Sequence, residues 1–201
     1  MQEVSGLMPI NSGDTSIGSA LKLQKTVVFV GMMGAGKTAV GRAVAQYFDV
    51  PFRDSDAALE EAAQMTIAEI FDRDGEAFFR DRETQVIDRL LAKSPSILST
   101  GGGAFMAARN RDLITAKGVS VWLQADLDLL WERVRHKDTR PLLRTADPYG
   151  TLKGIYEQRT PIYAEANVTV ETLASYSISD TTQAVVQALL AHPGILEASD
   201  V

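Results

Sequence analysis

The residues best able to do chemistry stand together at positions 31–38, which read GMMGAGKT. They fit the pattern G-x-x-x-x-G-K-[ST], whose glycines let backbone N–H groups turn inward around an anion. In such a loop the lysine, here Lys37, reaches the β- and γ-phosphates of a nucleotide, and the hydroxyl of Thr38 can ligate Mg²⁺. The alternative is a tight turn that carries an incidental lysine. We favour phosphate binding, with nucleotide contacts from Gly34, Ala35, Gly36, Lys37, Thr38 and Ala39.

The segments on either side of this loop are those that the pattern requires. Residues 25–30, KTVVFV, predict a buried strand. Residues 38–48 predict a helix whose apolar side chains fall near one face, namely Val40, Val44, Tyr47 and Phe48. The N-terminus of that helix presents free N–H groups and a partial positive charge, which attract an anion.

Short apolar strands alternate with helical patterns along the rest of the chain. We expect further strands at 50–54, 96–100, 118–123 and 167–172, and helices at 66–73, 76–91, 126–135 and 181–190. Thr66 can cap the second helix, and Gly75 breaks it. The alternation predicts an α/β fold with a five-stranded parallel sheet between two layers of helices. Ligands of such folds bind beyond the carboxyl ends of the strands.

Two carboxylates, Asp54 and Asp56, follow the strand at 50–54. Residues two apart in an extended segment point to the same side, so both would face the crevice beside the phosphate-binding loop. One can hold the hydration shell of Mg²⁺, and the other can accept a hydrogen bond or a proton from a substrate hydroxyl. The alternative is that one of them only caps the next helix, a role that Ser55 or Asp56 could fill.

Polar and small residues follow other predicted elements. The strand at 96–100 ends in three glycines, whose N–H groups can bind a substrate or the γ-phosphate: Gly101, Gly102 and Gly103. Arg80 and Glu83 lie three residues apart in a helix and can pair, although such a pair is most often an exposed salt bridge. Arg159 ends a helical stretch, where a cation can simply stabilise the helix terminus.

A run of positive charge lies further along the chain. This run contains one acidic residue, Asp138, and five basic residues: Arg133, Arg135, Lys137, Arg140 and Arg144. Such a run is usually a solvated face. Beside a nucleotide it can instead form a flap, in which Arg140 closes over the phosphates and neutralises charge during transfer.

Composition narrows the class of protein. The chain has 201 residues, 26 acidic and 20 basic, which gives a net charge of −6 and argues against a general nucleic-acid binder. It has no cysteine, so disulfides are excluded. No apolar run is long enough to cross a membrane, and the first residues lack the pattern of a signal peptide. We expect a flexible tail at 1–24, one domain at 25–191 and a short tail at 192–201.

Taken together, these features resemble the shikimate kinase family over residues 25–190. The shared segments, in order, are GMMGAGKT, RDSD, FRDRE, STGGGAF, TRPLL and QRTPIY. The resemblance implies a three-layer P-loop kinase fold with a substrate-binding helical insert at about 55–92 and a lid at about 136–150. It implies transfer of the γ-phosphoryl of ATP to the 3-hydroxyl of shikimate, with Mg²⁺, in aromatic amino acid biosynthesis. It also implies a cytoplasmic enzyme, which we expect to be a monomer.

The resemblance also implies residue roles. Asp56 binds the ring hydroxyls and is the candidate base, and Asp54 helps to hold Mg²⁺ through water. Arg80 and Arg159 grip the substrate carboxylate, with Glu83 steadying the arginine. The three glycines line the substrate site. On the nucleotide side, Arg133 resembles the arginine that stacks on adenine, with Arg135 as the alternative, and Arg140 belongs to the lid. The catalytic set is Lys37, Asp56 and Arg140.

Other functions compete with this interpretation. A gluconate kinase would share the phosphate-binding loop and the first half of the fold, but would not need the same Arg80, glycine and Arg159 set. A regulatory nucleotide-binding module without catalysis could retain Lys37 and lose Asp56. A nucleoside monophosphate kinase would need a second nucleotide pocket, of which the sequence gives no sign.

Overall fold

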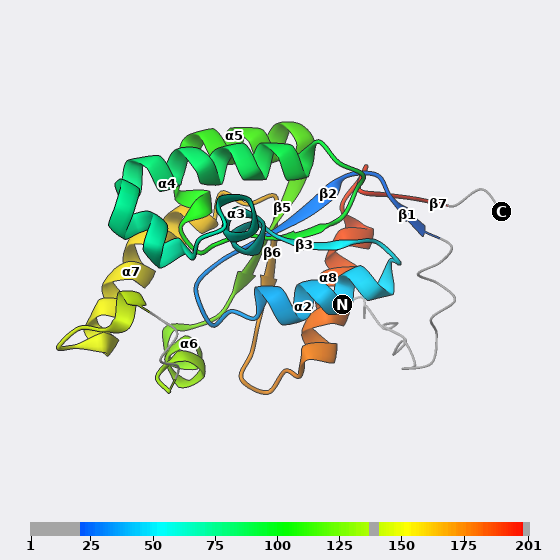
Figure 1. The fold of residues 1–201 in the computed structure, drawn as a ribbon. Helices are drawn as coiled ribbons and strands as arrows, with labels where there is room; N and C mark the ends of the chain where they lie inside the picture. Colours follow the sequence, from blue (N-terminus) through cyan, green and yellow to red (C-terminus); the bar gives the residue numbers. More distant parts are fainter. Residues whose placement is uncertain (1–20, 137–140, 199–201) are drawn as a thin grey trace.

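The computed structural model describes residues 21–136 and 141–198. Its main sheet has five parallel strands in the order β3-β4-β2-β5-β6 (Figure 1). All residues of β2 and β4 are buried, because helices cover both faces of the sheet. The predicted five-stranded parallel sheet is confirmed. Its strands are β2 (Thr26–Val30), β3 (Phe52–Asp54), β4 (Ile97–Ser99), β5 (Gly118–Gln124) and β6 (Val168–Glu171).

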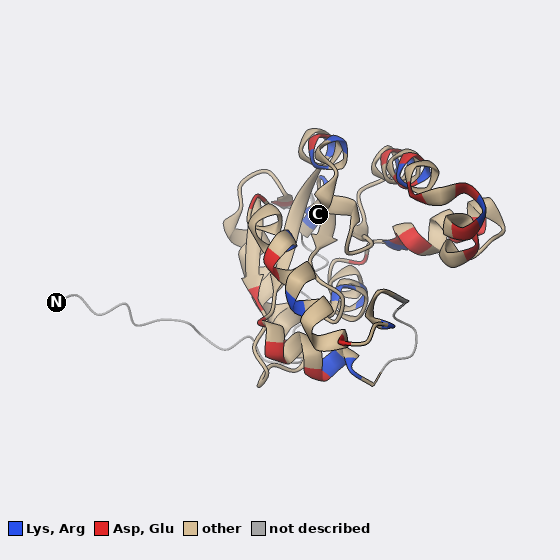
Figure 2. Cartoon of the chain, turned by 90° about the vertical axis from the view of Figure 1, so that its left-hand side faces the viewer, with Lys and Arg blue, Asp and Glu red and all other residues tan. Residues whose placement is uncertain are grey.

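Helices on both sides of the sheet complete the three layers. On one side lie α4 (Ile67–Leu91) and α5 (Ala108–Lys117), and on the other α2 (Lys37–Tyr47) and α8 (Ile178–Ala191). Acidic and basic residues are spread over the helices (Figure 2). Within the described ranges, no helix combines the length and the apolar character needed to cross a membrane. The other helical elements are α3 (Ser55–Ala63), η1 (Ala104–Met106), α6 (Leu127–Val134), η2 (Pro141–Leu143) and α7 (Pro148–Tyr163).

The start and the bend of α4 follow from its sequence. The side chain of Thr66 accepts from the N–H of Glu69 at 3.2 Å, and the Glu69 carboxylate accepts from the N–H of Thr66 at 2.7 Å. This reciprocal cap confirms Thr66 as the helix start. Gly75 has φ +79° and ψ 172°, so it bends the helix as predicted, and a glycine suits that conformation.

The ends of the chain correct the predicted tails. Residues 21–23 belong to the tail expected to be flexible and 196–198 to the predicted C-terminal tail, yet Leu21–Leu23 (β1) pairs antiparallel with Leu196–Ala198 (β7). Leu23 and the neighbouring Ile195 are buried, and the N–H of Gln24 donates to the carbonyl of Ile195 at 2.8 Å. Apolar burial and main-chain hydrogen bonds therefore hold residues 21–24 and 195–198 against the domain.

The helix α5 is missing from the predicted elements. It has no side-chain cap, and its first turn is polar, so its sequence lacks the usual helix signals. A buried residue holds it instead: Asn110 accepts from the hydroxyl of Thr84 at 2.7 Å and donates to the carbonyl of Ala104 at 2.8 Å. These bonds fasten α5 to α4 and to η1, directly after the three glycines.

Candidate active site

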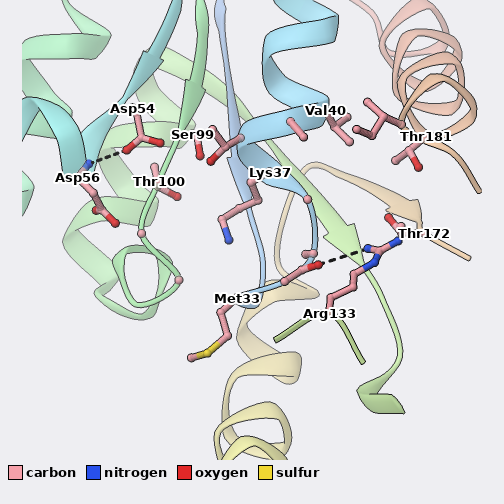
Figure 3. A pocket seen from close by; sticks show the side chains of 18 of the residues that line it. Met33, Lys37, Val40, Asp54, Asp56, Ser99, Thr100, Arg133, Thr172 and Thr181 are labelled. Atoms are coloured by element: carbon pink, nitrogen blue, oxygen red, sulfur yellow. Dashed lines mark hydrogen bonds between the residues drawn. The ribbon is translucent and has the colours of Figure 1, made fainter. Parts of the chain in front are cut away.

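A cavity of about 470 Å³ lies at the carboxyl ends of the strands (Figure 3). The phosphate-binding loop forms one wall, and Asp54 and Asp56 form another. Lys37 lies between the two carboxylates on one side and Arg133 on the other. The structure thus brings these predicted residues together around one space: Gly34, Ala35, Gly36, Lys37, Thr38, Ala39, Asp54, Asp56, Gly101, Gly102 and Arg133.

The loop has the backbone that its sequence predicts. Gly34 has φ +85° and Gly36 has φ +96°, a region that favours glycine. The helix α2 begins at Lys37, so its free N–H groups face the cavity side of the loop. The ammonium of Lys37 donates to the carbonyls of Gly31 at 2.8 Å and Met32 at 3.0 Å. Lys37 therefore braces the loop while it lines the cavity.

Arg133 rather than Arg135 lines the cavity. Its Nη1 donates to the carbonyl of Gly34 at 3.3 Å, and it lines the cavity. Arg135 pairs with Glu132 at 2.8 Å and is absent from the cavity lining. The guanidinium of Arg133 is thus joined directly to the phosphate-binding loop.

Asp54 and Asp56 have different local roles. Oδ1 of Asp54 caps α3, because it accepts from the N–H of Asp56 at 3.0 Å and of Ala57 at 3.3 Å. One of the two carboxylates therefore does cap the helix, as the alternative expected, but the capping residue is Asp54 and not Ser55 or Asp56. The geometric reason given for Asp56 is also wrong, because Asp56 stands in the first turn of α3 and not in an extended segment. Both carboxylates nevertheless line the cavity.

The environment of Asp56 raises its affinity for a proton. Burial raises the pKa of this carboxyl, and the charge of Asp54 raises it further. The ammonium of Lys37 acts in the opposite direction and lowers the pKa in part. A buried carboxylate with a raised pKa suits the transfer of a proton from a hydroxyl group.

Gly101 and Gly103 make room for two charged side chains. A Cβ atom built on Gly101 would lie 2.7 Å from Oδ1 of Asp56. One built on Gly103 would lie 2.9 Å from both Nη atoms of Arg80. Any larger residue at either position would displace the carboxylate or the guanidinium.

Gly102 lies beside the second arginine. A Cβ atom on Gly102 would stand 3.3 Å from Nη1 of Arg159. The three glycines after β4 therefore face Asp56, Arg159 and Arg80 in turn. One carboxylate and two guanidinium groups therefore lie beside a single stretch of backbone that carries no side chains.

Two carboxylates hold the guanidinium of Arg80. Its Nη1 donates to Oε1 and Oε2 of Glu83 at 3.2 and 3.0 Å, and its Nε and Nη2 donate to Glu76 at 3.4 and 3.3 Å. Glu83 is buried, which raises its pKa, while the charge of Arg80 lowers it. The pair is thus not the exposed salt bridge that its spacing alone suggested. It fixes Arg80 in place against Gly103.

The sequence analysis gave no role to Tyr163, the last residue of α7. Its side chain is fully buried, and its hydroxyl donates to the carbonyl of Gly102 at 2.5 Å. Burial raises the pKa of the Tyr163 hydroxyl, the nearby charge of Arg159 lowers it in part, and the ring stacks on Trp122 with centroids 6.1 Å apart. The available signal was the spacing of four residues from Arg159, which places both side chains on one helix face.

The opposite wall of the cavity was also missed. It comes from the loop after β6 and the start of α8, where Ser177 caps the helix by accepting from the N–H of Asp180 at 3.1 Å. The pattern S-x-x-D was the sequence signal for that cap. Arg140, the remaining predicted site residue, lies outside the described residues. The lining side chains of this wall are Thr172, Tyr176, Ser177, Ile178 and Thr181.

The oxygen atoms of Thr38 and Asp54 fit a magnesium ion whose other ligands are mainly phosphate oxygens. Within the described residues there is no group of three or more His, Cys, Asp or Glu side chains that could hold a metal by themselves. Thr38 and Asp54 both line the cavity, and the two capping hydrogen bonds of Asp54 use only Oδ1. Mg²⁺ is commonly bound through one or two protein oxygens together with water and substrate phosphates.

Comparison with known proteins is consistent with this site. The family model for shikimate kinase matches residues 33–190. A shikimate kinase of Ruegeria pomeroyi is 61% identical over 94% of this chain and 97% of its own length, and one of Cereibacter sphaeroides is 58% identical over 89% of each. The structure of shikimate kinase from Acinetobacter baumannii in complex with shikimate superposes with a TM-score of 0.80, at 35% identity over 88% of this chain and 97% of that one.

A gluconokinase from Sinorhizobium meliloti shares the fold, with a TM-score of 0.59, 18% identity and coverage of 84% of this chain and 93% of that one. At that identity the likeness concerns the fold alone. The family model and the relatives above extend over most of this chain at far higher identity. The chain belongs to the shikimate kinase family.

Proposed function

We propose that this chain transfers the γ-phosphoryl of ATP to the 3-hydroxyl of shikimate, forming shikimate 3-phosphate and ADP in aromatic amino acid biosynthesis. The observation that carries this proposal is the stretch Gly101–Gly103, which faces Asp56, Arg159 and Arg80 beside a phosphate-binding loop. Shikimate has one carboxylate and three hydroxyls. A site that recognises it needs cationic groups for the carboxylate and a hydrogen-bond acceptor for the hydroxyls. That chemistry matches the groups around the glycines.

The two arginines are proposed to bind the carboxylate of the acceptor. A guanidinium offers a planar pair of donors that matches a carboxylate, which a lysine cannot do. Arg80 is held by Glu83 and Glu76, and Arg159 lies beside Gly102 and Tyr163, so both guanidinium groups are near the glycines before the substrate arrives. When the side chains of a site are already ordered, less of the binding free energy is lost in ordering them.

Asp56 is proposed to orient the ring hydroxyls and to accept the proton of the 3-hydroxyl as its oxygen attacks phosphorus. Its raised pKa supports this role, since a carboxylate of ordinary pKa is a weaker base. The ammonium of Lys37 lines the cavity beside both carboxylates, so it neutralises negative charge on the phosphoryl group during transfer. Phosphoryl transfer depends mainly on such positioning and charge balance.

The nucleotide side completes the proposal. Backbone N–H groups of residues 34–39 bind the phosphates, and Arg133 contacts the adenine end. Thr38 would hold Mg²⁺ directly and Asp54 through water, and the ion when bound neutralises phosphate charge. We assign the exclusion of water to a lid at about residues 136–150 and the neutralisation of phosphate charge to Arg140, which lies outside the described residues. The enzyme acts as a cytoplasmic monomer, without a nucleic acid or a membrane as partner.

A coupled assay of ADP release tests the proposal. The full chain with ATP and Mg²⁺ is offered shikimate, gluconate and a nucleoside monophosphate in separate reactions. Turnover with shikimate alone is the expected result. Turnover with gluconate but not shikimate would overturn the assignment, and nucleotide binding without turnover on any acceptor would favour a regulatory module.

A further inference from the structure

A second hollow lies between α3 and α4, away from the cavity that holds the phosphate-binding loop. It has a volume of about 410 Å³, which is within the range of sites for small molecules. Its floor is apolar and includes Leu59, Ile70 and Val86, all of which are buried. The two hollows share no lining residue. This second hollow is therefore a separate candidate site.

The charge around this hollow has a single sign. Three arginines line it, Arg73, Arg82 and Arg89, while no aspartate or glutamate does. The chain as a whole has more acids than bases, 26 against 20, so this arrangement is a local departure from the composition. An apolar floor below several guanidinium groups favours an anion with an apolar body.

The three arginines differ in what already holds them. Arg73 pairs with Asp74 at 2.7 Å. Nη1 of Arg82 donates to Gln85 at 2.8 Å, and its guanidinium lies 4.8 Å from the ring centre of Phe78. Arg89 has no hydrogen bond or ion pair with any residue in the described ranges. Arg89 and the unused donors of Arg82 are thus the groups open to a ligand.

We propose that this hollow binds a small aromatic or alicyclic carboxylate, with its ring on the floor of Leu59, Ile70 and Val86 and its carboxylate bound by Arg82 and Arg89. The ring supplies apolar contact, and the carboxylate accepts charge-assisted hydrogen bonds from the guanidinium groups. The inference depends on this geometry and not on the reaction catalysed at the other cavity.

Calorimetric titration of the full chain with three probes tests the site. The probes are 2-naphthoate, its neutral analogue 2-naphthamide, and inorganic phosphate, an anion without an apolar body. We expect 2-naphthoate to bind once per chain and more tightly than either other probe. In the Arg82→Ala/Arg89→Ala variant its Kd should rise about tenfold or more, because charge-assisted bonds are lost. Arg109→Ala, which removes an exposed arginine of α5, is the matched control and should leave Kd unchanged.

Two further measurements distinguish binding in this hollow from binding to the arginines of the active site. Binding of 2-naphthoate should persist in the Arg159→Ala variant and in the presence of saturating shikimate. Loss of binding in either condition, equal affinity for 2-naphthamide or phosphate, or an unchanged Kd in the double variant would overturn the inference. If the double variant does not fold, Arg89→Gln alone, checked by its melting temperature, replaces it and should also weaken binding.

Discussion

The hydroxyl of Tyr163 donates to the carbonyl oxygen of Gly102 at 2.5 Å, which ties the end of α7 to the loop after β4. The guanidinium of Arg159 lies near the same side chain, where its charge lowers the tyrosine pKa in part, and it also lies beside Gly102. Tyr163 thus lies between an arginine and a glycine that belong to different elements. We expect its role to be the positioning of Arg159.

The first prediction concerns this contact. Tyr163→Phe should raise KM for shikimate several-fold and leave KM for ATP and kcat nearly unchanged, since only the position of Arg159 is loosened. It should also lower the free energy of unfolding by about 1–3 kcal/mol, because the Gly102 carbonyl loses its donor. Steady-state kinetics and chemical denaturation measure the two effects. Tyr149→Phe, an exposed tyrosine that donates to Asp128, is the control. Equal KM values in wild type and Tyr163→Phe would rule out the positioning role.

The second prediction concerns the bare backbone after β4. Gly101→Ala should abolish most activity, because its Cβ would lie 2.7 Å from the carboxylate of Asp56. Gly154→Ala in α7 is the matched control, since nothing lies within 4 Å of a Cβ there. The control should keep its activity and gain about 0.5–1 kcal/mol in helix stability. Similar activity in both variants would show that the close approach at Gly101 is unimportant.

The third prediction concerns Lys37. Lys37→Met should retain the fold but lose more than a hundredfold in turnover, about 3 kcal/mol of transition-state stabilisation. Circular dichroism checks the fold, which matters because Lys37 also bonds the carbonyls of Gly31 and Met32. Lys117→Met, an exposed lysine paired with Asp88, should turn over normally. Near-normal turnover in a folded Lys37→Met enzyme would contradict the assignment.

The fourth prediction separates two roles of Arg159. Arg159→Ala should weaken shikimate binding by about 1.5–3 kcal/mol and leave ATP binding unchanged. Arg159→Lys should recover only part of that loss, because lysine lacks the planar fork. Separate titrations with each ligand measure both effects, with Lys153→Ala on the exposed face of the same helix as control. A lower melting temperature with unchanged shikimate affinity would instead indicate an arginine that serves only its helix terminus.

The fifth prediction follows from the raised pKa of Asp56. The acid limb of kcat/KM should lie above the ordinary aspartate pKa of about 4, and Asp56→Asn should lose activity by at least a hundredfold. The effect of rising pH on the free energy of unfolding has the opposite sign to its effect on activity. The native state holds this proton more tightly than the unfolded chain, so stability falls as pH rises from the ordinary to the raised pKa.

Asp56→Asn should therefore melt at a higher temperature than wild type at neutral pH, and the difference should shrink as pH falls and Asp56 becomes protonated. Thermal denaturation across pH measures this. The control is Asp72→Asn, an exposed aspartate of α4. An Asp56→Asn variant that is less stable than wild type at neutral pH would show that the carboxylate stabilises the fold.

The sequence predicted residues that follow strands better than residues that come together through packing. Asp54, Asp56 and the three glycines were found because the ends of parallel strands meet at one edge of a sheet. Tyr163 was missed because its role depends on Gly102, 61 residues away. The pairing of β1 with β7 was missed for the same reason, since it joins the two ends of the chain. Asp56 was expected beside the cavity from a wrong local conformation, and it lines the cavity from the first turn of α3 instead.

The order of the strands sets the scale of the site. β4 stands between β3, which leads to the two aspartates, and β2, which leads to the phosphate-binding loop. Neighbouring strands lie about 4.8 Å apart, so the anchors of donor and acceptor are separated by roughly two strand spacings, about 10 Å. Ser99 and Thr100, at the end of β4, contribute only short side chains to that interval, and the three glycines that follow contribute none. The gap therefore suits a compact ring between its own anchors and a phosphoryl group.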